Sequence, residues 1–170
     1  MLVIVSVALG TNAWAGIQDD RFDGNIFALY AGNGSLVPPK VTLAKSLSSE
    51  RPTLLTFYID DSRDCKQFSA IISQIQAYYG RVLDFIPIDV DSIPVKASYD
   101  PTEPGYYYKG KVPQTLVFDI SGKQVLDVVG RGRFEQFDDV LRNVFDLLPR
   151  SESVELKRRA LNEVNAELVK

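Results

Sequence analysis

Histidine is absent from this 170-residue chain, and cysteine, tryptophan and methionine each occur once. Without histidine the chain holds neither a Ser-His-Asp triad nor a Cys-His nucleophile pair, and no metal site in it uses an imidazole ligand. The single cysteine, Cys65, excludes an internal disulfide bond and any site built from several thiolates. We therefore expect no bound metal and no cofactor.

The chain also has no excess of basic residues. The chain has 19 Lys and Arg against 22 Asp and Glu, a formal net charge of -3 and a pI near 5.0. Proteins that bind nucleic acids normally carry a strong basic excess, so no nucleic-acid partner is expected. With 45% hydrophobic and 24% charged residues, the composition is that of one globular domain with extensions.

The one apolar run at the start of the chain, residues 2–9, is shorter than the roughly 20 residues of a membrane-spanning helix. It ends at Ala13-Trp14-Ala15, which has the form of a signal-peptide cleavage site. The basic residues that usually precede such a run are absent. A buried first strand is the alternative, but the polar stretch that follows disfavours it. We predict that residues 1–15 are a signal peptide or a membrane anchor.

Residues 16–39 form a predicted N-terminal extension that contains a small hairpin. Residues 25–30 are its first strand, Gly32-Asn33-Gly34 is its turn, and Pro38-Pro39 ends it. A short helix is expected over residues 41–47 with Thr42 as its cap.

Cys65 lies where a strand, residues 53–59, passes through a charged loop into a helix. Apolar residues recur along that helix at steps of three and four: Phe68, Ile71, Ile72, Ile75 and Tyr78 or Tyr79. Another strand is expected over residues 82–90, parallel to the first. A thiol at a helix N-terminus is a favourable place for a thiolate.

This segment resembles the active site of the thioredoxin superfamily, in which a strand, Trp-Cys-Gly-Pro-Cys-Lys and a helix follow one another. Cys65 and Lys66 fall on the second cysteine and its lysine, whereas Ser62, Arg63 and Asp64 replace Cys, Gly and Pro. The attacking cysteine is thus missing. The resemblance also places Asp61 at the position of the family's tryptophan and Thr56 at that of its buried aspartate.

A second thioredoxin landmark follows at Val112-Pro113, where the resemblance implies a cis-proline edge beside the active-site loop. A hairpin over residues 116–129 and a helix up to Pro149 complete the pattern. The resemblance implies an α/β fold, a thioredoxin-like three-layer sandwich with a mixed central sheet. We assign this domain to residues 40–149, with its first strand and helix before residue 53, and a charged C-terminal helix to residues 150–170.

Residues 92–111 stand where a thioredoxin has its second helix, but they contain three prolines and the run Tyr106, Tyr107 and Tyr108. Two interpretations are open. The rings could form an exposed contact surface, or they could clamp an irregular loop onto the core.

Cys65 allows three chemical interpretations. It could be a monothiol oxidoreductase, although Asp60, Asp61 and Asp64 oppose the favourable effect of Arg63 and Lys66 on its thiolate. Ser62-x-x-Cys65 resembles the peroxiredoxin core, but Tyr58 replaces that family's proline and no arginine can be assigned. In the third interpretation, which we favour, Cys65 packs as a small hydrophobe and the fold serves recognition.

The whole chain resembles the thylakoid-membrane thioredoxin-like proteins of cyanobacteria, some of which are photosystem I accumulation factors. The combination of residues 60–65 and residues 103–113 carries this resemblance. It implies an assembly role at a thylakoid membrane or in its lumen, with subunits of a photosynthetic complex as partners. A monothiol enzyme that uses Cys65 is the alternative function.

Overall fold

The centre of the fold is a four-stranded mixed sheet, seen in a computed structural model that describes residues 16–153. Its strands are β1 (Thr53–Tyr58), β2 (Asp84–Asp89), β3 (Gln114–Phe118) and β4 (Gln124–Val129), in the order β2-β1-β3-β4. β1 and β2 are parallel, whereas β3 is antiparallel to both β1 and β4. The β-α-β unit predicted for residues 53–90 and the hairpin predicted for residues 116–129 are confirmed.

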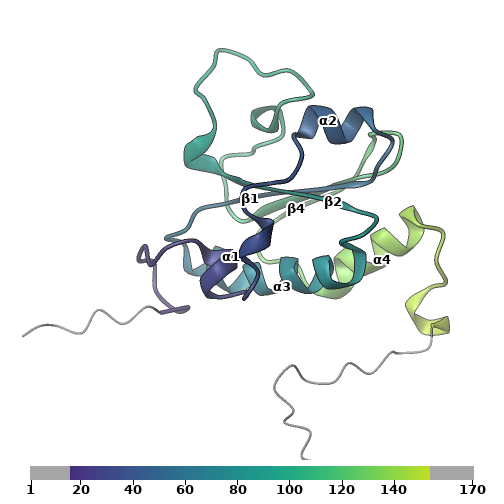
Figure 1. Ribbon diagram of the computed structural model, residues 1–170, viewed down its shortest axis with the longest axis horizontal. Coiled ribbons are helices and arrows are strands. Elements are labelled where there is room, and N and C mark those ends of the chain that lie inside the picture. The colour runs from purple at the N-terminus through teal and green to yellow at the C-terminus, as the bar shows by residue number, and fades with distance from the viewer. Residues whose placement is uncertain (1–15, 154–170) are drawn as a thin grey trace, which may run out of the picture.

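Helices cover both faces of this sheet and give the three predicted layers (Figure 1). α3 (Arg63–Tyr79) and α4 (Phe134–Val144) lie on one face together with the short α1 (Ile26–Leu29). α2 (Leu43–Ser48) lies on the other, with Thr42 as its cap as predicted. Two apolar clusters fill the spaces between the layers, one under α3 and α4 and one under α2. The fold is thioredoxin-like.

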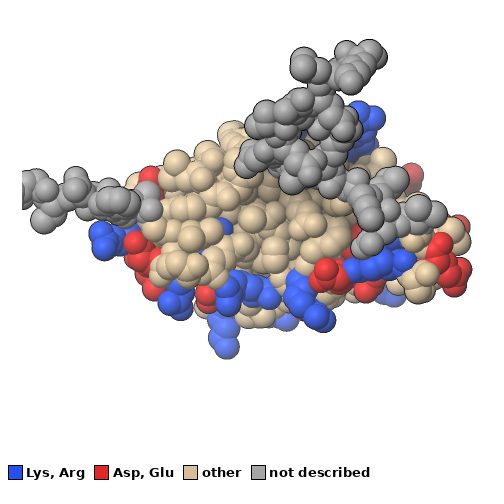
Figure 2. All heavy atoms as spheres, turned by 90° about the horizontal axis from the view of Figure 1, so that it is seen from below, with Lys and Arg blue, Asp and Glu red and all other residues tan. Residues whose placement is uncertain are grey.

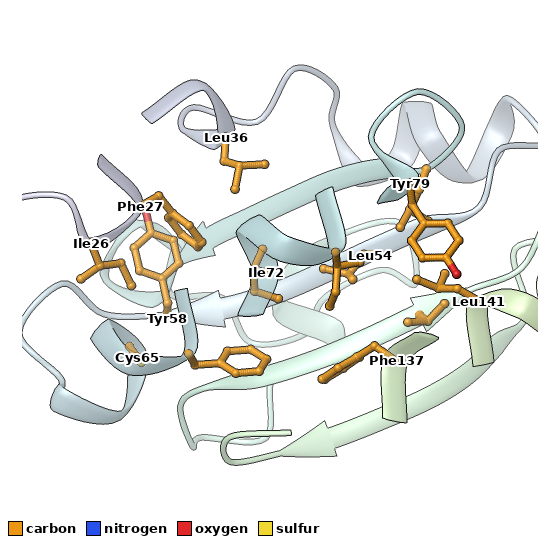
Figure 3. Packing of buried hydrophobic residues seen from close by; sticks show 14 residues of the cluster. Ile26, Phe27, Leu36, Leu54, Tyr58, Cys65, Ile72, Tyr79, Phe137 and Leu141 are labelled. Atoms are coloured by element: carbon orange, nitrogen blue, oxygen red, sulfur yellow. The ribbon is translucent and has the colours of Figure 1, made fainter. Parts of the chain in front are cut away.

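The apolar stripe of α3 packs on the sheet as its spacing requires (Figure 3). Phe68, Ile72, Ile75 and Tyr79 are all buried in the cluster that also holds Leu54 of β1. The Tyr79 hydroxyl, at the far end of the helix, donates to Asp138 of α4 at 2.5 Å. This contact joins the two long helices of the layer.

The predicted hairpin within residues 25–37 is wrong. Residues 26–29 form α1, because the side chain of Asn25 accepts hydrogen bonds from the first N–H groups and the buried pair Ile26 and Phe27 packs against α3. A 3₁₀ turn, Gly34–Leu36, follows. The expected first strand before residue 53 is also absent from residues 16–52, because residues 25–30 form α1 and its two caps.

The final helix is shorter than predicted. α4 ends at Val144, and Asp146 adopts a left-handed conformation with φ 51° that turns the chain away. Leu147 and Leu148 are therefore exposed and do not continue the apolar stripe. A 3₁₀ turn, Arg150–Glu152, comes next.

Two predicted segments lie outside the described residues. They are the signal peptide or anchor of residues 1–15 and the C-terminal helix beyond residue 153. Within residues 16–153, none of the helices has the length and apolar character needed to span a bilayer.

Candidate functional site

Cys65 sits in the first turn of α3 with its side chain inside the core. Ser62 caps the helix, and its hydroxyl accepts a hydrogen bond from the Cys65 N–H at 3.3 Å. Cys65 is only 1% exposed and belongs to the cluster that contains Ile26 and Tyr58 (Figure 3). Burial raises its pKa, which hydrogen bonds from the Ile59 backbone and Ser62 only partly oppose. The thiolate is therefore disfavoured despite the helix N-terminus.

Lys66 does not serve the thiol, contrary to the expectation that it favours a thiolate. Its side chain is fully buried, and its ammonium donates to Gly16 O at 3.1 Å, to Asp19 at 3.1 Å and to Asp23 at 2.6 Å. Burial alone would lower the pKa of Lys66, but the hydrogen bonds to Asp23 and Asp19 outweigh it and raise the pKa. The charge of Lys66 is thus compensated by the N-terminal segment.

The acidic residues of the loop differ in their surroundings. Asp60 accepts a hydrogen bond from the Ile26 N–H at 2.9 Å, and burial raises the pKa of its carboxyl group. Asp61 is exposed, and Asp64 pairs with Arg131 at 3.5 Å. Asp60 thus fixes α1 to the end of β1, whereas the side chain of Asp61 faces solvent.

Thr56 provides no substitute for the buried aspartate of thioredoxins. It is buried, and its hydroxyl is 2.8 Å from that of Thr115 on β3. Two neutral hydroxyl groups titrate far outside the physiological range, so this pair stabilises the sheet and cannot take a proton from Cys65.

The edge at Val112 and Pro113 lies at the same end of the sheet as the Cys65 turn, since β3 starts beside the end of β1. Val112 packs against both apolar clusters, including the one that contains Cys65. The peptide bond before Pro113 is cis, and the carbonyl of Pro113 accepts a hydrogen bond from Gly130 N at 2.7 Å. Gly130 has φ 92°, a conformation that favours glycine. Residues from three separate parts of the chain thus meet at this end of the sheet.

The three tyrosines divide between the two interpretations. The Tyr107 ring packs edge-on against Phe118 with centroids 5.0 Å apart, and the Tyr108 ring lies 5.2 Å from that of Phe57. Both clamp their loop onto the sheet face that α2 covers. Tyr106 is 55% exposed. Only Tyr106 therefore presents most of its ring to solvent.

The N-terminal contacts of this site could not be predicted from the sequence. Lys66 and its partner Asp23 are 43 positions apart, and no periodic pattern connects them. Asp19 and Asp23 lie in a polar stretch, and nothing in the neighbouring sequence indicates that they pair with Lys66. Among residues 16–153, no group of three or more acidic or cysteine side chains could hold a metal ion.

We expect Cys65 to react with iodoacetamide at least about tenfold more slowly in the folded protein than in guanidinium chloride at pH 7. Its raised pKa keeps the thiol protonated, and burial blocks access. The rate should increase only above the ordinary thiol pKa of about 8.5. Mass spectrometry of labelled protein measures both rates, with Cys65→Ser as the blank. Rapid labelling near neutral pH would contradict this description of the thiol.

Comparisons with known proteins place the chain among thioredoxin-like relatives, although no family model matches it. It is 25% identical over 130 residues to the thiol:disulfide interchange protein TxlA homolog of Synechocystis sp. (strain ATCC 27184 / PCC 6803 / Kazusa), covering 76% of this chain and 66% of that protein. A mutant thioredoxin from Halobacterium salinarum NRC-1 superposes with a TM-score of 0.47 at 22% identity, over 61% of this chain and 84% of that one.

A much nearer relative comes from the same Synechocystis strain. The thylakoid membrane protein slr1796 is 57% identical to this chain over 157 residues, which are 92% of this chain and 78% of that protein. Such identity over nearly the whole length establishes common descent, and the chain belongs to the family of the thylakoid membrane protein slr1796.

Proposed function

We propose that this protein is an assembly or accumulation factor for a photosynthetic membrane complex, photosystem I by resemblance, and that it acts at the thylakoid membrane through protein contacts. The name of its relative slr1796 supports the location. The thioredoxin-like fold serves here as a recognition domain, and no thiol exchange is required.

The single observation that carries this proposal is the state of Cys65. Thiol-disulfide exchange needs an accessible thiolate and, in the dithiol mechanism, a second cysteine. Cys65 is buried, its pKa is raised, and Ser62 occupies the position of the partner thiol. These properties disfavour the monothiol alternative as well.

The surface next to Cys65 remains suited to binding. Asp61 and Arg63 project from the turn, and Val112 lies half-buried at the cis-proline edge. An extended segment of a partner could pair with backbone groups of such an edge. Tyr106, with most of its ring exposed, is the further candidate contact.

Complementation of a strain that lacks this protein can separate a binding role from a role that needs the Cys65 thiol. In a cyanobacterial strain that lacks its own protein of this family, we expect Cys65→Ser to restore photosystem I content fully, because a buried serine of similar size leaves the contact surface unchanged. Photosystem I is measured by P700 absorbance in isolated membranes.

Tyr106→Ala is the surface variant, and loss of restoration with an intact fold would assign Tyr106 to the interface. If Cys65→Ser fails to restore photosystem I while the folded protein accumulates, the thiol is required and the proposal is wrong.

A further inference from the structure

The N-terminal segment Gly16–Asn25, here called the N-terminal strap, is fastened across the first turn of α3. Asp20 accepts a hydrogen bond from the backbone N–H of Arg63 at 2.8 Å, and the side chains of Gln18 and Gln67 are hydrogen-bonded at 2.8 Å. In Figure 1 the strap is the purple segment beside the start of α3. These contacts hold the strap against the same turn that carries Cys65.

Lys66 is the central attachment of the strap. Its buried ammonium is bonded to Gly16 O at one end and to Asp23 at the other. Tyr30 adds a second bond to Asp23, from its hydroxyl at 2.5 Å. Gly16, the first of the described residues, is therefore held against the start of α3.

The strap and its surroundings expose apolar side chains. Phe22 is 71% exposed, and Ile17 and Leu29 are also exposed. Ile17 and Phe22 are 8 and 13 positions after the end of the apolar run of residues 2–9. Ile17 and Phe22 both belong to the strap, so the strap presents two large apolar side chains to its surroundings.

The ends of the strands define the orientation. β1 and β2 finish at the end of the sheet that carries the Cys65 turn, and β3 starts there, since Phe57 pairs with Gln114. The turn after β3, which includes the exposed Ile120, lies at the opposite end. The Val112-Pro113 edge therefore shares the end that carries the strap.

We propose that the strap end of the domain lies against the lipid bilayer, with Phe22 and Ile17 in the interfacial layer and the Cys65 turn facing the membrane. This inference rests on the proposed action at the thylakoid membrane, with residues 1–15 retained as the anchor rather than removed as a signal peptide. Because Gly16 is held at the strap end, the chain passes from residues 1–15 into the domain at this end, which places the strap end toward the lipid surface. A partner that binds the Val112-Pro113 edge is then contacted close to the membrane.

Charge complementarity does not drive this contact. Arg21 and Arg63 are exposed at the strap end, but so are Asp20 and Asp61. Figure 2 shows that charges of both signs alternate along the margin of the helical face. The contact should therefore form on zwitterionic lipid and gain little from anionic lipid.

The test uses the full chain on phosphatidylcholine vesicles. In a Cys65→Ser background, a fluorophore is attached at Asp61→Cys near the strap or at Lys123→Cys at the opposite end. Spin-labelled lipid headgroups should quench the label at position 61 and leave the label at position 123 unquenched. Flotation measures vesicle binding separately.

Two variants test the cause. Lys66→Met removes the charge that holds the strap, so quenching at position 61 should be lost while flotation persists. Phe22→Ser should also lower this quenching, whereas its exposed control Ile120→Ser should not. Flotation with equal quenching at both positions, or with none at either, overturns the orientation but leaves the proposed membrane association standing. Failure to float contradicts that association and the orientation with it.

Discussion

Phe57→Ala is expected to lower the free energy of unfolding by about 4 kcal/mol. Phe57 is fully buried near the end of β1, and its ring packs against Tyr108. The substitution removes both the transfer energy of the ring and its contacts, and neighbours fixed in a sheet refill such a cavity poorly. Urea denaturation followed by circular dichroism measures the change.

The matched control is Tyr106→Ala, which removes an aromatic ring of similar size from the surface of the same region. Tyr106 contacts the Tyr107 ring but is mostly exposed, so we expect a loss of about 1 kcal/mol or less. Equal losses in the two variants would mean that the tyrosine loop is anchored through Tyr106, against the packing described here.

Ser62→Cys should convert the site into an oxidisable dithiol. Ser62 caps α3 and Cys65 lies three residues later, a separation at which Cβ atoms are roughly 5–6 Å apart on a helix and small adjustments permit a disulfide. Diamide should accept the two electrons and two protons of the thiols, and the count of free thiols should fall from about two to zero. The lost serine cap should cost about 1 kcal/mol.

Ser62→Cys in a Cys65→Ser background controls for intermolecular disulfides, which would appear as dimers on non-reducing gels. If both thiols remain free with excess diamide in the folded protein, the geometry of the turn does not permit a disulfide, and the turn differs from a dithiol site by more than the missing cysteine. The arrangement of the loop would then differ from that of a dithiol enzyme.

The order of the main elements could be predicted from the sequence because their signals are local. The spacing of Phe68, Ile72 and Ile75 places one face of α3 on the sheet, and a glycine turn between two β-rich runs indicates the β3-β4 hairpin. The lack of a second cysteine and of histidine limits the chemistry in any fold. These conclusions follow from the spacing of neighbouring residues or from the number of cysteine and histidine residues in the chain.

The corrections come from residues whose structure depends on distant partners. Residues 25–30 are apolar enough for a strand, but Asn25 caps a helix because Asp60 and the core beside α3 hold it there. Likewise, Tyr107 and Tyr108 pack against Phe118 and Phe57, which no local pattern links to them.

The thioredoxin-like order of elements and the loss of the dithiol follow from the amino-acid sequence without any coordinates. The role of Lys66 does not, because only the folded chain shows that it fastens the N-terminal strap and gives no support to the Cys65 thiolate. A buried ammonium is stable only beside compensating charges, and the fold supplies Asp19 and Asp23 from more than 40 residues away. The sequence thus identifies Lys66 as a charged residue, whereas the long-range packing determines that its charge pairs with Asp19 and Asp23 and not with Cys65.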